Sequence, residues 1–320
     1  MTQPNIVLLH RFPPENNGDV GLLKDKLSEN LPDVDIERCT DYADSKKKIT
    51  DAKIVVEHRI DDELLEEATE LEWIQSLSSG YDRFDLKSLS EDDIVLTTVS
   101  GVHADPIAQH VLGYVLAFER GHHRAWRQKQ RREWRRFTPG DLTGKTIGVV
   151  GVGSIGSRIC ELFDAVGATV LGVKRDLDSV PHGIDEIYSP ERLHTVLNRS
   201  NYVVASCPLT PETRELFDKR AFASMGSDSI FVNVSRGEVV DEDALVDALS
   251  TGMLGGAALD VTTDEPLPKE SPLWDFENVL ITPHLAGGSG KFAERCADII
   301  STNYERFVNG QQEYMTNRVV

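Results

Sequence analysis

The chain has 320 residues, of which 40% are hydrophobic, 7% aromatic and 27% charged. This length predicts two domains with cores large enough to fold without disulfides or metals. The composition excludes a fibrous or a globally disordered protein. No apolar run reaches about 18 residues, which argues against a membrane-spanning helix. The N-terminal residues lack a basic and apolar leader, so we expect a cytoplasmic protein whose mature form begins near residue 1.

The charge is unbalanced, with 53 acidic residues against 34 basic ones and a net charge of -19. Such a negative field disfavours binding to nucleic acid or to an anionic membrane. The acidic residues are dispersed and lysine is scarce, which favours salt adaptation over a simple gain in solubility. The four cysteines form no C-x-x-C pair and have no histidine at metal-ligand spacing, so neither a disulfide framework nor a zinc site is expected.

Apolar runs alternate with helical patterns through the first third of the chain. The patterns predict helices over 20–31 and 61–71. Strands are predicted at 6–9, 34–36, 54–56, 73–77 and 94–98. This alternation is typical of a parallel sheet with helices on both faces.

A helical pattern over 104–119 and a basic stretch over 120–136 lead into a second block of the same kind. In that block, strands are predicted at 147–150, 169–173, 202–205, 230–233, 256–260 and 279–282, and helices at 155–166 and 292–307. No low-complexity linker separates the two blocks. We therefore predict an α/β protein with two Rossmann-like, doubly wound parallel-sheet domains separated by a cleft.

The basic stretch over 120–136 contains seven arginines together with Trp126 and Trp134. It could bind an anion or a nucleic acid, or it could be a solvated or subunit-facing helix. The net negative charge of the chain favours the second interpretation. The two tryptophans favour a subunit interface, where large aromatic side chains are enriched.

A glycine-rich motif, Gly151-Val-Gly153-Ser-Ile-Gly156, follows a predicted strand and opens a helical pattern. This is the context in which a G-x-G-x-x-G sequence binds a dinucleotide. Gly151 allows the tight turn, Gly153 lets the backbone approach a pyrophosphate, and Gly156 lets the helix pack against the strand. The amides of Ser154 and Ile155 are expected to face phosphate at the helix N-terminus.

The residues after the predicted strand 169–173 bear on the choice of dinucleotide. An NAD site places an acidic residue there to bind the ribose 2′-hydroxyl, whereas this chain has Lys174 and Arg175, with Asp176 one step later. Two cations suit a 2′-phosphate, which predicts a preference for NADP(H) over NAD(H). The alternative is that both cations point to solvent and Asp176 binds the ribose.

Three polar residues follow later predicted strands: Arg236, Glu265 and His284. In open α/β sheets, ligands bind outside the carboxyl ends of the strands, where these residues are expected to lie. Together they suit a 2-keto acid, because they provide a cation to hold a carboxylate, a proton donor, and a carboxylate to tune that donor.

The chain resembles the D-isomer-specific 2-hydroxyacid dehydrogenase family over essentially its whole length. The resemblance is carried by segments 142–156, 207–213, 233–237, 258–261, 264–266 and 282–284, in this order and spacing. It implies that Arg236, Glu265 and His284 are catalytic. It further implies cofactor contacts for Asp260, beside the nicotinamide, and for Cys207 and Thr213, and binding of the substrate carboxylate by the backbone amides of Ser79 and Gly80.

The resemblance also implies the domain roles and the assembly. Residues 1–100 with 290–320 would bind substrate, residues 101–289 would bind the dinucleotide, and a homodimer would form around the helix after residue 103 and the following segment. The chain departs from the family pattern at Lys174 and Arg175, and at Gln109, where a glutamate is common. We expect no regulatory domain after residue 320, and therefore do not expect a phosphoglycerate dehydrogenase of the long type.

The expected reaction is NAD(P)H-dependent reduction of a 2-keto acid to a D-2-hydroxy acid. Arg236 would hold the substrate, His284 would give a proton to the carbonyl oxygen, and Glu265 would orient His284 and favour its charged form. Glyoxylate or hydroxypyruvate reduction, which uses the same residues, is one alternative. A non-catalytic corepressor that senses dinucleotides is another. Candidate walls of the substrate pocket are Arg11, Phe12, His58, Arg59 and Tyr81.

Overall fold

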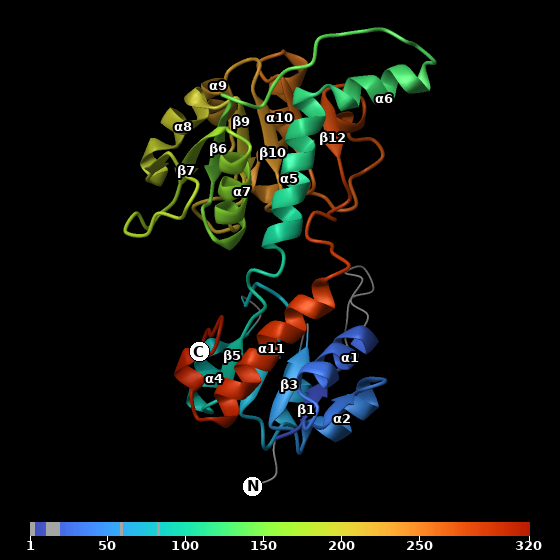
Figure 1. Cartoon of the computed structure of the whole chain (residues 1–320), viewed down its shortest axis with the longest axis vertical. Helices are drawn as coiled ribbons and strands as arrows, with labels where there is room; N and C mark the ends of the chain where they lie inside the picture. Colours follow the sequence, from blue (N-terminus) through green and yellow to red (C-terminus); the bar gives the residue numbers. More distant parts are fainter. Residues whose placement is uncertain (1–3, 11–19, 58–59, 82–83) are drawn as a thin grey trace. The chain divides into compact units, whose positions relative to one another are not determined.

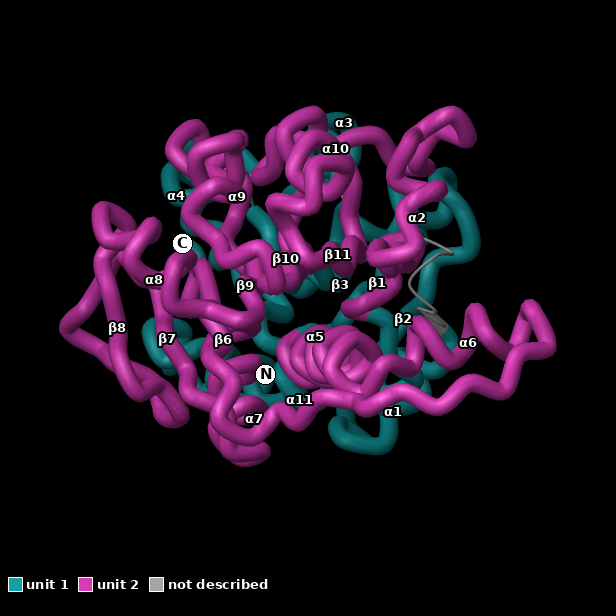
Figure 2. The backbone as a smooth tube through the Cα atoms, turned by 90° about the horizontal axis from the view of Figure 1, so that it is seen from above, with its two compact units in different colours: residues 1–103, 288–320 teal, residues 104–287 magenta. Residues whose placement is uncertain are grey.

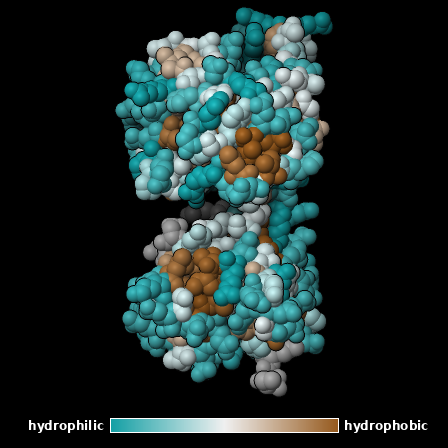
Figure 3. Space-filling view, turned by 90° about the vertical axis from the view of Figure 1, so that its left-hand side faces the viewer, coloured by the Kyte–Doolittle hydropathy of each residue, from teal (hydrophilic) through white to brown (hydrophobic). Residues whose placement is uncertain are grey.

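The computed structural model of the chain describes residues 4–10, 20–57, 60–81 and 84–320. Within it the chain forms two compact units, one of residues 1–103 with 288–320 and one of residues 104–287 (Figure 2). In the part of the chain that is described, no helix has both the length and the apolar character needed to cross a bilayer. Hydrophilic side chains dominate the face shown in Figure 3.

The first unit is built on a five-stranded parallel sheet with the strand order β2-β1-β3-β4-β5 (Figure 1). This order is one of the two common doubly wound arrangements. The strands are β1 (Ile6–Leu8), β2 (Ile36–Arg38), β3 (Ile54–Glu57), β4 (Trp73–Ser76) and β5 (Val95–Thr97). The helices are α1 (Val20–Asn30), α2 (Tyr42–Ile49), α3 (Asp62–Glu66), α4 (Leu86–Glu91) and α11 (Phe292–Val308), and a 3₁₀ helix spans Gln312–Tyr314.

Both faces of this sheet are buried because successive side chains of each strand point to opposite sides. In β1, Ile6 and Leu8 join the cluster formed with α1 and α11, whereas Val7 joins the cluster formed with α2, α3 and α4. The strands therefore read as continuous apolar runs, which is the pattern of a parallel sheet covered on both faces.

One predicted helix of this unit is shorter in the structure. The pattern predicts a helix over 61–71, but α3 ends at Glu66. Its start is well defined, because the Asp61 side chain accepts a hydrogen bond from the backbone N–H of Leu64. If the helix continued, Glu66 and Glu70 would lie one turn apart on the same face. Such a like-charge pair destabilises a helix.

The second unit is built on a seven-stranded parallel sheet with the order β12-β11-β10-β9-β6-β7-β8. Its strands are β6 (Thr146–Val150), β7 (Thr169–Val173), β8 (Glu186–Tyr188), β9 (Tyr202–Ala205), β10 (Ile230–Asn233), β11 (Gly256–Leu259) and β12 (Val279–Ile281). Its helices are α5 (Ala104–Glu119), α6 (His122–Gln130), α7 (Ser154–Ala165), α8 (Leu193–Arg199), α9 (Lys219–Ser224) and α10 (Glu242–Ser250), and 3₁₀ helices span Pro190–Arg192, Gly237–Val239 and Pro272–Trp274.

The strand order of this sheet reverses between β6 and β9. The chain runs outward from β6 to β7 and β8, then returns to build β9 to β12 on the other side. Helices α5 and α7 cover one face, while α8, α9 and α10 cover the other. At such a reversal, the loops after the strands diverge and leave room for a ligand at the carboxyl edge. The two predicted parallel-sheet α/β domains are thus both present.

The basic stretch forms an arm that leaves α5 and returns before β6. Figure 1 shows α6 and the chain after it extending beyond the sheet of this unit. The base of the arm is closed, because Gly140 N–H donates to the carbonyl of Glu119 (2.8 Å) and Arg120 Nη1 donates to the carbonyl of Gly140 (2.6 Å). Trp126 is 60% exposed and Trp134 is 95% exposed. The arm therefore presents two large aromatic side chains to solvent.

The turn between β6 and α7 depends on glycine for two reasons. Gly151 has a φ of 99°, a conformation that side chains disfavour. At Gly156, an added Cβ would lie 2.2 Å from the carbonyl oxygen of Gly151, a backbone atom that cannot rotate away. The close packing of α7 on the turn therefore requires a residue without a side chain.

We expect Gly156→Ala to destabilise the protein by about 1–3 kcal/mol, the usual effect of overpacking. The matched control is Gly113→Ala, another helical glycine whose added Cβ would meet no atom within 4 Å. That control should be neutral or stabilising by about 0.5–1 kcal/mol. Urea unfolding followed by circular dichroism measures both, and a Gly156→Ala variant as stable as wild type would contradict the packing argument.

Candidate active site

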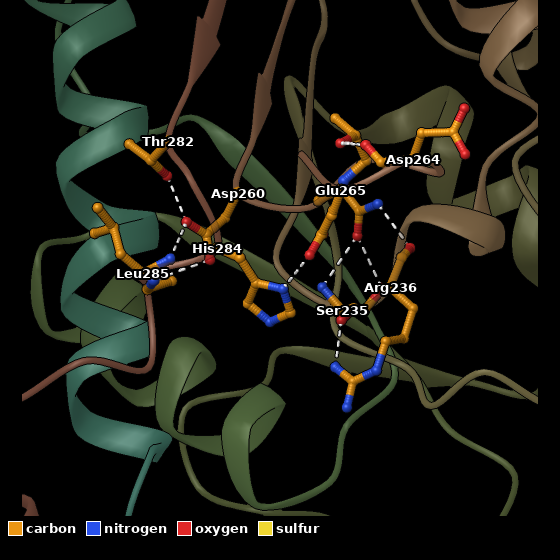
Figure 4. Close-up of polar contacts among 11 residues, drawn as sticks. Ser235, Arg236, Asp260, Asp264, Glu265, Thr282, His284 and Leu285 are labelled. Atoms are coloured by element: carbon orange, nitrogen blue, oxygen red, sulfur yellow. Dashed lines mark hydrogen bonds and ion pairs between the residues drawn. The ribbon is translucent and has the colours of Figure 1, made fainter. Parts of the chain in front are cut away.

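Polar side chains from three strand ends meet at the carboxyl edge of the second sheet. Arg236 comes three residues after β10, Asp260 directly follows β11, and His284 comes three residues after β12. Because parallel strands end at the same edge, these residues lie together although they are far apart in sequence. Figure 4 shows that Glu265, from the loop after β11, turns toward His284, with Arg236 beside them.

The side chains of His284 and Glu265 form a short hydrogen bond. Nδ1 of His284 lies 2.7 Å from Oε2 of Glu265. Since an ionised carboxylate only accepts hydrogen bonds, Nδ1 carries a proton and donates it. The other Glu265 oxygen accepts from the backbone N–H of Thr262 (3.2 Å). Both oxygens of Glu265 are thus held by hydrogen bonds. Nε2 of His284 remains as the ring nitrogen that can form a hydrogen bond with a ligand. The His284 side chain is 51% exposed.

The backbone of His284 has an unusual conformation. Its φ of 49° lies in the left-handed region, which non-glycine residues seldom occupy. Its N–H donates to the carbonyl of Asp260 (2.8 Å). The Asp260 side chain, only 4% exposed, accepts from the backbone N–H of Leu285 and of Ala286, each at 2.9 Å, and from the Thr282 hydroxyl. Asp260 therefore holds both sides of the turn that presents His284.

Arg236 is presented by a second turn. The buried Asn233 side chain accepts from the N–H and hydroxyl of Ser235 and donates to the carbonyl of Arg236 (2.9 Å). One guanidinium nitrogen of Arg236, Nη1, donates to the Ser235 carbonyl (2.7 Å). A guanidinium has five N–H donors in a planar fork, so this contact leaves capacity for a two-point bond to a carboxylate.

The turn between β6 and α7 has the properties of a pyrophosphate site. It lies at the reversal of strand order, and α7 begins at Ser154 with Gly153 as its N-cap. The space around Gly153 is open, since an added Cβ would meet nothing within 4 Å. The unpaired N–H groups at the start of a helix attract phosphate oxygens. The residues of this turn, including Ile155, therefore fit a dinucleotide.

The loop after β7 shows where its charged residues point. Nζ of Lys174 donates to the carbonyl of Ser179 (2.8 Å), and the Asp176 carboxylate accepts from the N–H of Asp178 (3.0 Å). Asp176 is thus folded back into its own loop. Arg175 is exposed. A hydrogen bond from Thr210, with a smaller contribution from Arg175, lowers the pKa of Glu212.

The loop after β9 contains the other two predicted cofactor residues. Cys207 is 6% exposed, and its backbone lies against Gly151, where an added Cβ would be 2.5 Å away. Burial raises the pKa of the Cys207 thiol to about 11, so this residue contributes an uncharged wall. Thr213 donates to the carbonyl of Pro208 (2.6 Å) and accepts from the N–H of Thr210 (2.8 Å), which closes the loop.

In the first unit, Ser79 and Gly80 follow β4 and are exposed. Gly80 N–H donates to the Ser78 hydroxyl (3.2 Å), and Tyr81 is 48% exposed. The other candidate pocket walls lie outside the described residues: Arg11, Phe12, His58 and Arg59. No group of three or more potential metal ligands occurs among the residues that the structure describes.

Two residues of α5 that sequence reasoning missed also reach this edge. Nε2 of His110 lies 3.1 Å from the Thr282 hydroxyl and 3.9 Å from Asp260 Oδ1. The Tyr114 hydroxyl contacts the same Thr282 hydroxyl and lies 3.3 Å from the Leu259 carbonyl. The i, i+4 spacing of His110 and Tyr114 places them on one face of the helix, which was the only signal in the sequence.

Comparison with known proteins gives a consistent picture. Residues 112–286 match the family model of the NAD binding domain of D-isomer specific 2-hydroxyacid dehydrogenases. A glyoxylate reductase from Pyrococcus furiosus is 30% identical over 316 residues, which cover 95% of this chain and 93% of that protein. A D-3-phosphoglycerate dehydrogenase from Methanocaldococcus jannaschii is 28% identical over 294 residues, but the match spans only 55% of its length.

Solved structures of the same kind superpose on the whole chain. A D-isomer specific 2-hydroxyacid dehydrogenase family protein from Aeromonas salmonicida is 32% identical, with a TM-score of 0.81 and 99% of both chains covered. An NADPH-dependent glyoxylate/hydroxypyruvate reductase from Sinorhizobium meliloti, in complex with NADP and sulfate, is 26% identical. Its TM-score is 0.80, and the match covers 99% of this chain and 98% of that one.

Proposed function

This chain belongs to the D-isomer specific 2-hydroxyacid dehydrogenase family, and we propose that it reduces a small 2-keto acid to the D-2-hydroxy acid with NAD(P)H. The observation that carries the proposal is the 2.7 Å bond between His284 Nδ1 and Glu265 Oε2, beside Arg236, at the edge that also holds the dinucleotide turn. A proton donor oriented by a carboxylate, next to a carboxylate-binding cation, is what keto-acid reduction needs.

The proposed mechanism assigns one task to each side chain. Arg236 binds the substrate carboxylate through its planar fork. His284 begins as the imidazolium and gives its Nε2 proton to the carbonyl oxygen, which becomes the hydroxyl, so that the ring ends neutral. Glu265 accepts from Nδ1 throughout, which fixes the ring and stabilises its positive charge before the transfer. The dinucleotide, when bound, supplies the hydride to the carbonyl carbon.

Two alternative functions are compatible with the same residues. Reduction of glyoxylate or hydroxypyruvate is a special case of the proposed reaction, and the Pyrococcus furiosus and Sinorhizobium meliloti proteins are named for it. A dinucleotide-sensing corepressor would not need an oriented proton donor, so the His284–Glu265 bond favours the enzyme. The roles of Ser79 and Gly80 in binding substrate stay predictions from the family resemblance.

Replacing His284 by Ala should reduce turnover by roughly two to four orders of magnitude, the usual contribution of a general acid. The dissociation constant of NADPH should stay within about twofold of wild type, because the dinucleotide turn lies on a different loop. Steady-state reduction of glyoxylate and hydroxypyruvate, with fluorescence titration of NADPH, measures both quantities. A variant with near-normal turnover would remove His284 from the mechanism.

We propose that the cofactor is NADPH in preference to NADH. The loop after β7 carries Lys174 and Arg175, and the carboxylate of the next residue, Asp176, accepts a hydrogen bond from the N–H of Asp178. A carboxylate at the ribose would repel a 2′-phosphate, whereas cations attract it. The relative from Sinorhizobium meliloti is described as NADPH-dependent, which supports this choice.

Replacing Lys174 and Arg175 by Gln should abolish most of the preference for NADPH. A charge-assisted contact contributes about 1.5–3 kcal/mol, which corresponds to roughly a ten- to hundredfold change in affinity. The matched control is the exposed pair Lys219 and Arg220, replaced by Gln in the same way. The measurement is kcat/KM for both cofactors. A wild type that prefers NADH, or a double variant with unchanged preference, would show that these side chains do not recognise the phosphate.

We also propose a homodimer formed through the basic arm. Residues 120–136 carry seven arginines and one lysine against one glutamate, a charge of +7, so the remainder of the chain carries -26. The arm of one copy is therefore attracted to the acidic surface of another. Trp126 and Trp134 supply the exposed aromatic area that interfaces commonly bury.

Replacing Trp126 and Trp134 by Ser should convert the dimer to a monomer in sedimentation velocity experiments. The control is Trp274→Ser, which alters a tryptophan of the same unit that is 51% exposed but lies outside the arm. Trp274→Ser should leave the sedimentation coefficient unchanged. A wild-type protein that sediments as a monomer, or an arm variant that stays dimeric, would refute this interface.

We propose further that the protein is adapted to a cytoplasm of high salt. The net charge of -19 produces self-repulsion in the folded state, and salt screens it. The thermal unfolding midpoint should therefore rise with KCl concentration into the molar range. A parallel series in sucrose, which is excluded from protein surfaces but does not screen charge, is the control. Greatest stability in the absence of salt would contradict the proposal.

A further inference from the structure

We propose that His110 and Thr282 are positioning residues, which orient the carboxylate of Asp260 and thereby the turn that presents His284. The inference rests on the proposed function only in that His284 is taken as the proton donor. The contacts themselves join α5, the end of β11 and the loop after β12 within one unit.

The directions of the hydrogen bonds follow from the chemistry of the groups. The ionised Asp260 carboxylate can only accept hydrogen bonds, so the Thr282 hydroxyl donates its single proton to Asp260 Oδ1. The Thr282 oxygen must then accept from Nε2 of His110, 3.1 Å away. His110 therefore carries a proton on Nε2. The Tyr114 hydroxyl contacts the same oxygen, and its single proton can be donated either to a second lone pair there or to the Leu259 carbonyl, 3.3 Å away.

Burial makes this arrangement necessary. The Asp260 carboxylate is almost completely buried, and leaving one of its bonds unmade would incur the desolvation penalty of a charged group. Burial also lowers the pKa of His110, although Asp260 opposes the shift, so that the neutral ring is favoured. A neutral imidazole donates from one nitrogen alone, and the structure requires that nitrogen to be Nε2.

The turn after β12 transmits the orientation of Asp260 to His284. Leu285 donates to Oδ1 and Ala286 to Oδ2, so a rotation of the carboxylate would break one or both bonds. His284 precedes these residues and has the left-handed φ of 49°. Release of the two amides would let the backbone relax toward ordinary angles and would turn the imidazole away from Glu265. The main effect should therefore fall on proton transfer, and so on kcat.

Two pairs of variants test the proposal by kinetics. His110→Leu and Thr282→Val remove the donor, whereas His110→Gln and Thr282→Ser keep a donor near the same place. We expect the first pair to lose about ten- to a hundredfold in kcat, the scale of a small misplacement of a catalytic group. The second pair should stay within about threefold of wild type. The NADPH dissociation constant should change by a smaller factor than kcat in all four, although Asp260 is itself expected beside the nicotinamide.

The control is His194→Leu, which removes another histidine–hydroxyl contact, the 2.8 Å bond between His194 Nδ1 and the Ser224 hydroxyl. This variant should have wild-type kcat. Wild-type kcat in His110→Leu and Thr282→Val would overturn the proposal. Equal losses in His110→Leu and His110→Gln, together with a lowered unfolding midpoint in both, would also overturn it, because a merely structural role predicts that result.

A spectroscopic readout separates this proposal from the proposed function. In ¹⁵N-labelled protein, the two-bond proton–nitrogen correlations of His110 should show the tautomer protonated at Nε2. His110→Leu should shift the ring resonances of His284, while His194→Leu should not. If no keto acid is reduced but these spectra are observed, the proposed function fails and the positioning role stands. A His110 ring protonated at Nδ1, or an unshifted His284, would refute the positioning role.

Discussion

The buried carboxylate of Asp260 is the constraint on which the proposed active site depends. A buried charge must be matched by donors, and for Asp260 they are two backbone amides and a hydroxyl of the loop after β12. Because the donors are backbone groups of Leu285 and Ala286, satisfying the charge fixes the path of the chain. His284 is held in a left-handed conformation as a result, with its ring against Glu265.

The parallel sheet explains how distant residues come to share this edge. Each functional segment follows a strand, and the strands run in the same direction, so that their carboxyl ends are neighbours. The turn proposed to bind the dinucleotide follows β6 at the reversal of strand order, whereas Arg236, Glu265 and His284 follow β10, β11 and β12. The sheet is covered on both faces by apolar side chains and forms a rigid scaffold. The irregular loops at its edge can therefore hold the proposed functional residues in fixed positions.

The sequence correctly predicted those helices and strands whose limits are marked by a change in local residue composition. The strand Thr169–Val173 is an apolar run between a Gly-Ala pair and charged residues, and its limits were predicted correctly. The helix predicted over 61–71 is present but ends at Glu66, because apolar spacing was counted without the repulsion between Glu66 and Glu70. The strand Glu186–Tyr188 was missed because three residues, one of them charged, at the edge of a sheet give almost no pattern.

The candidate site was predictable where one residue or motif carries its own chemistry, as with the glycine turn and the His284–Glu265 pair. The network around Asp260 was not, because its partners lie far apart in sequence and only the fold joins them: His110 and Thr282 are separated by 172 positions. The contacts of Lys174 and Asp176 within their own loop were also beyond prediction, since they depend on the side-chain directions after β7.

The central claim is that this edge performs hydride reduction of a 2-keto acid with the proton coming from an oriented histidine. The most direct measurement is oxidation of NADPH by wild-type protein across a panel of 2-keto acids, with chiral analysis of each product. The account predicts turnover of at least one small 2-keto acid, with the D-2-hydroxy acid as product. Tight binding of the dinucleotide without turnover of any member of the panel, or formation of the L-isomer, would contradict it.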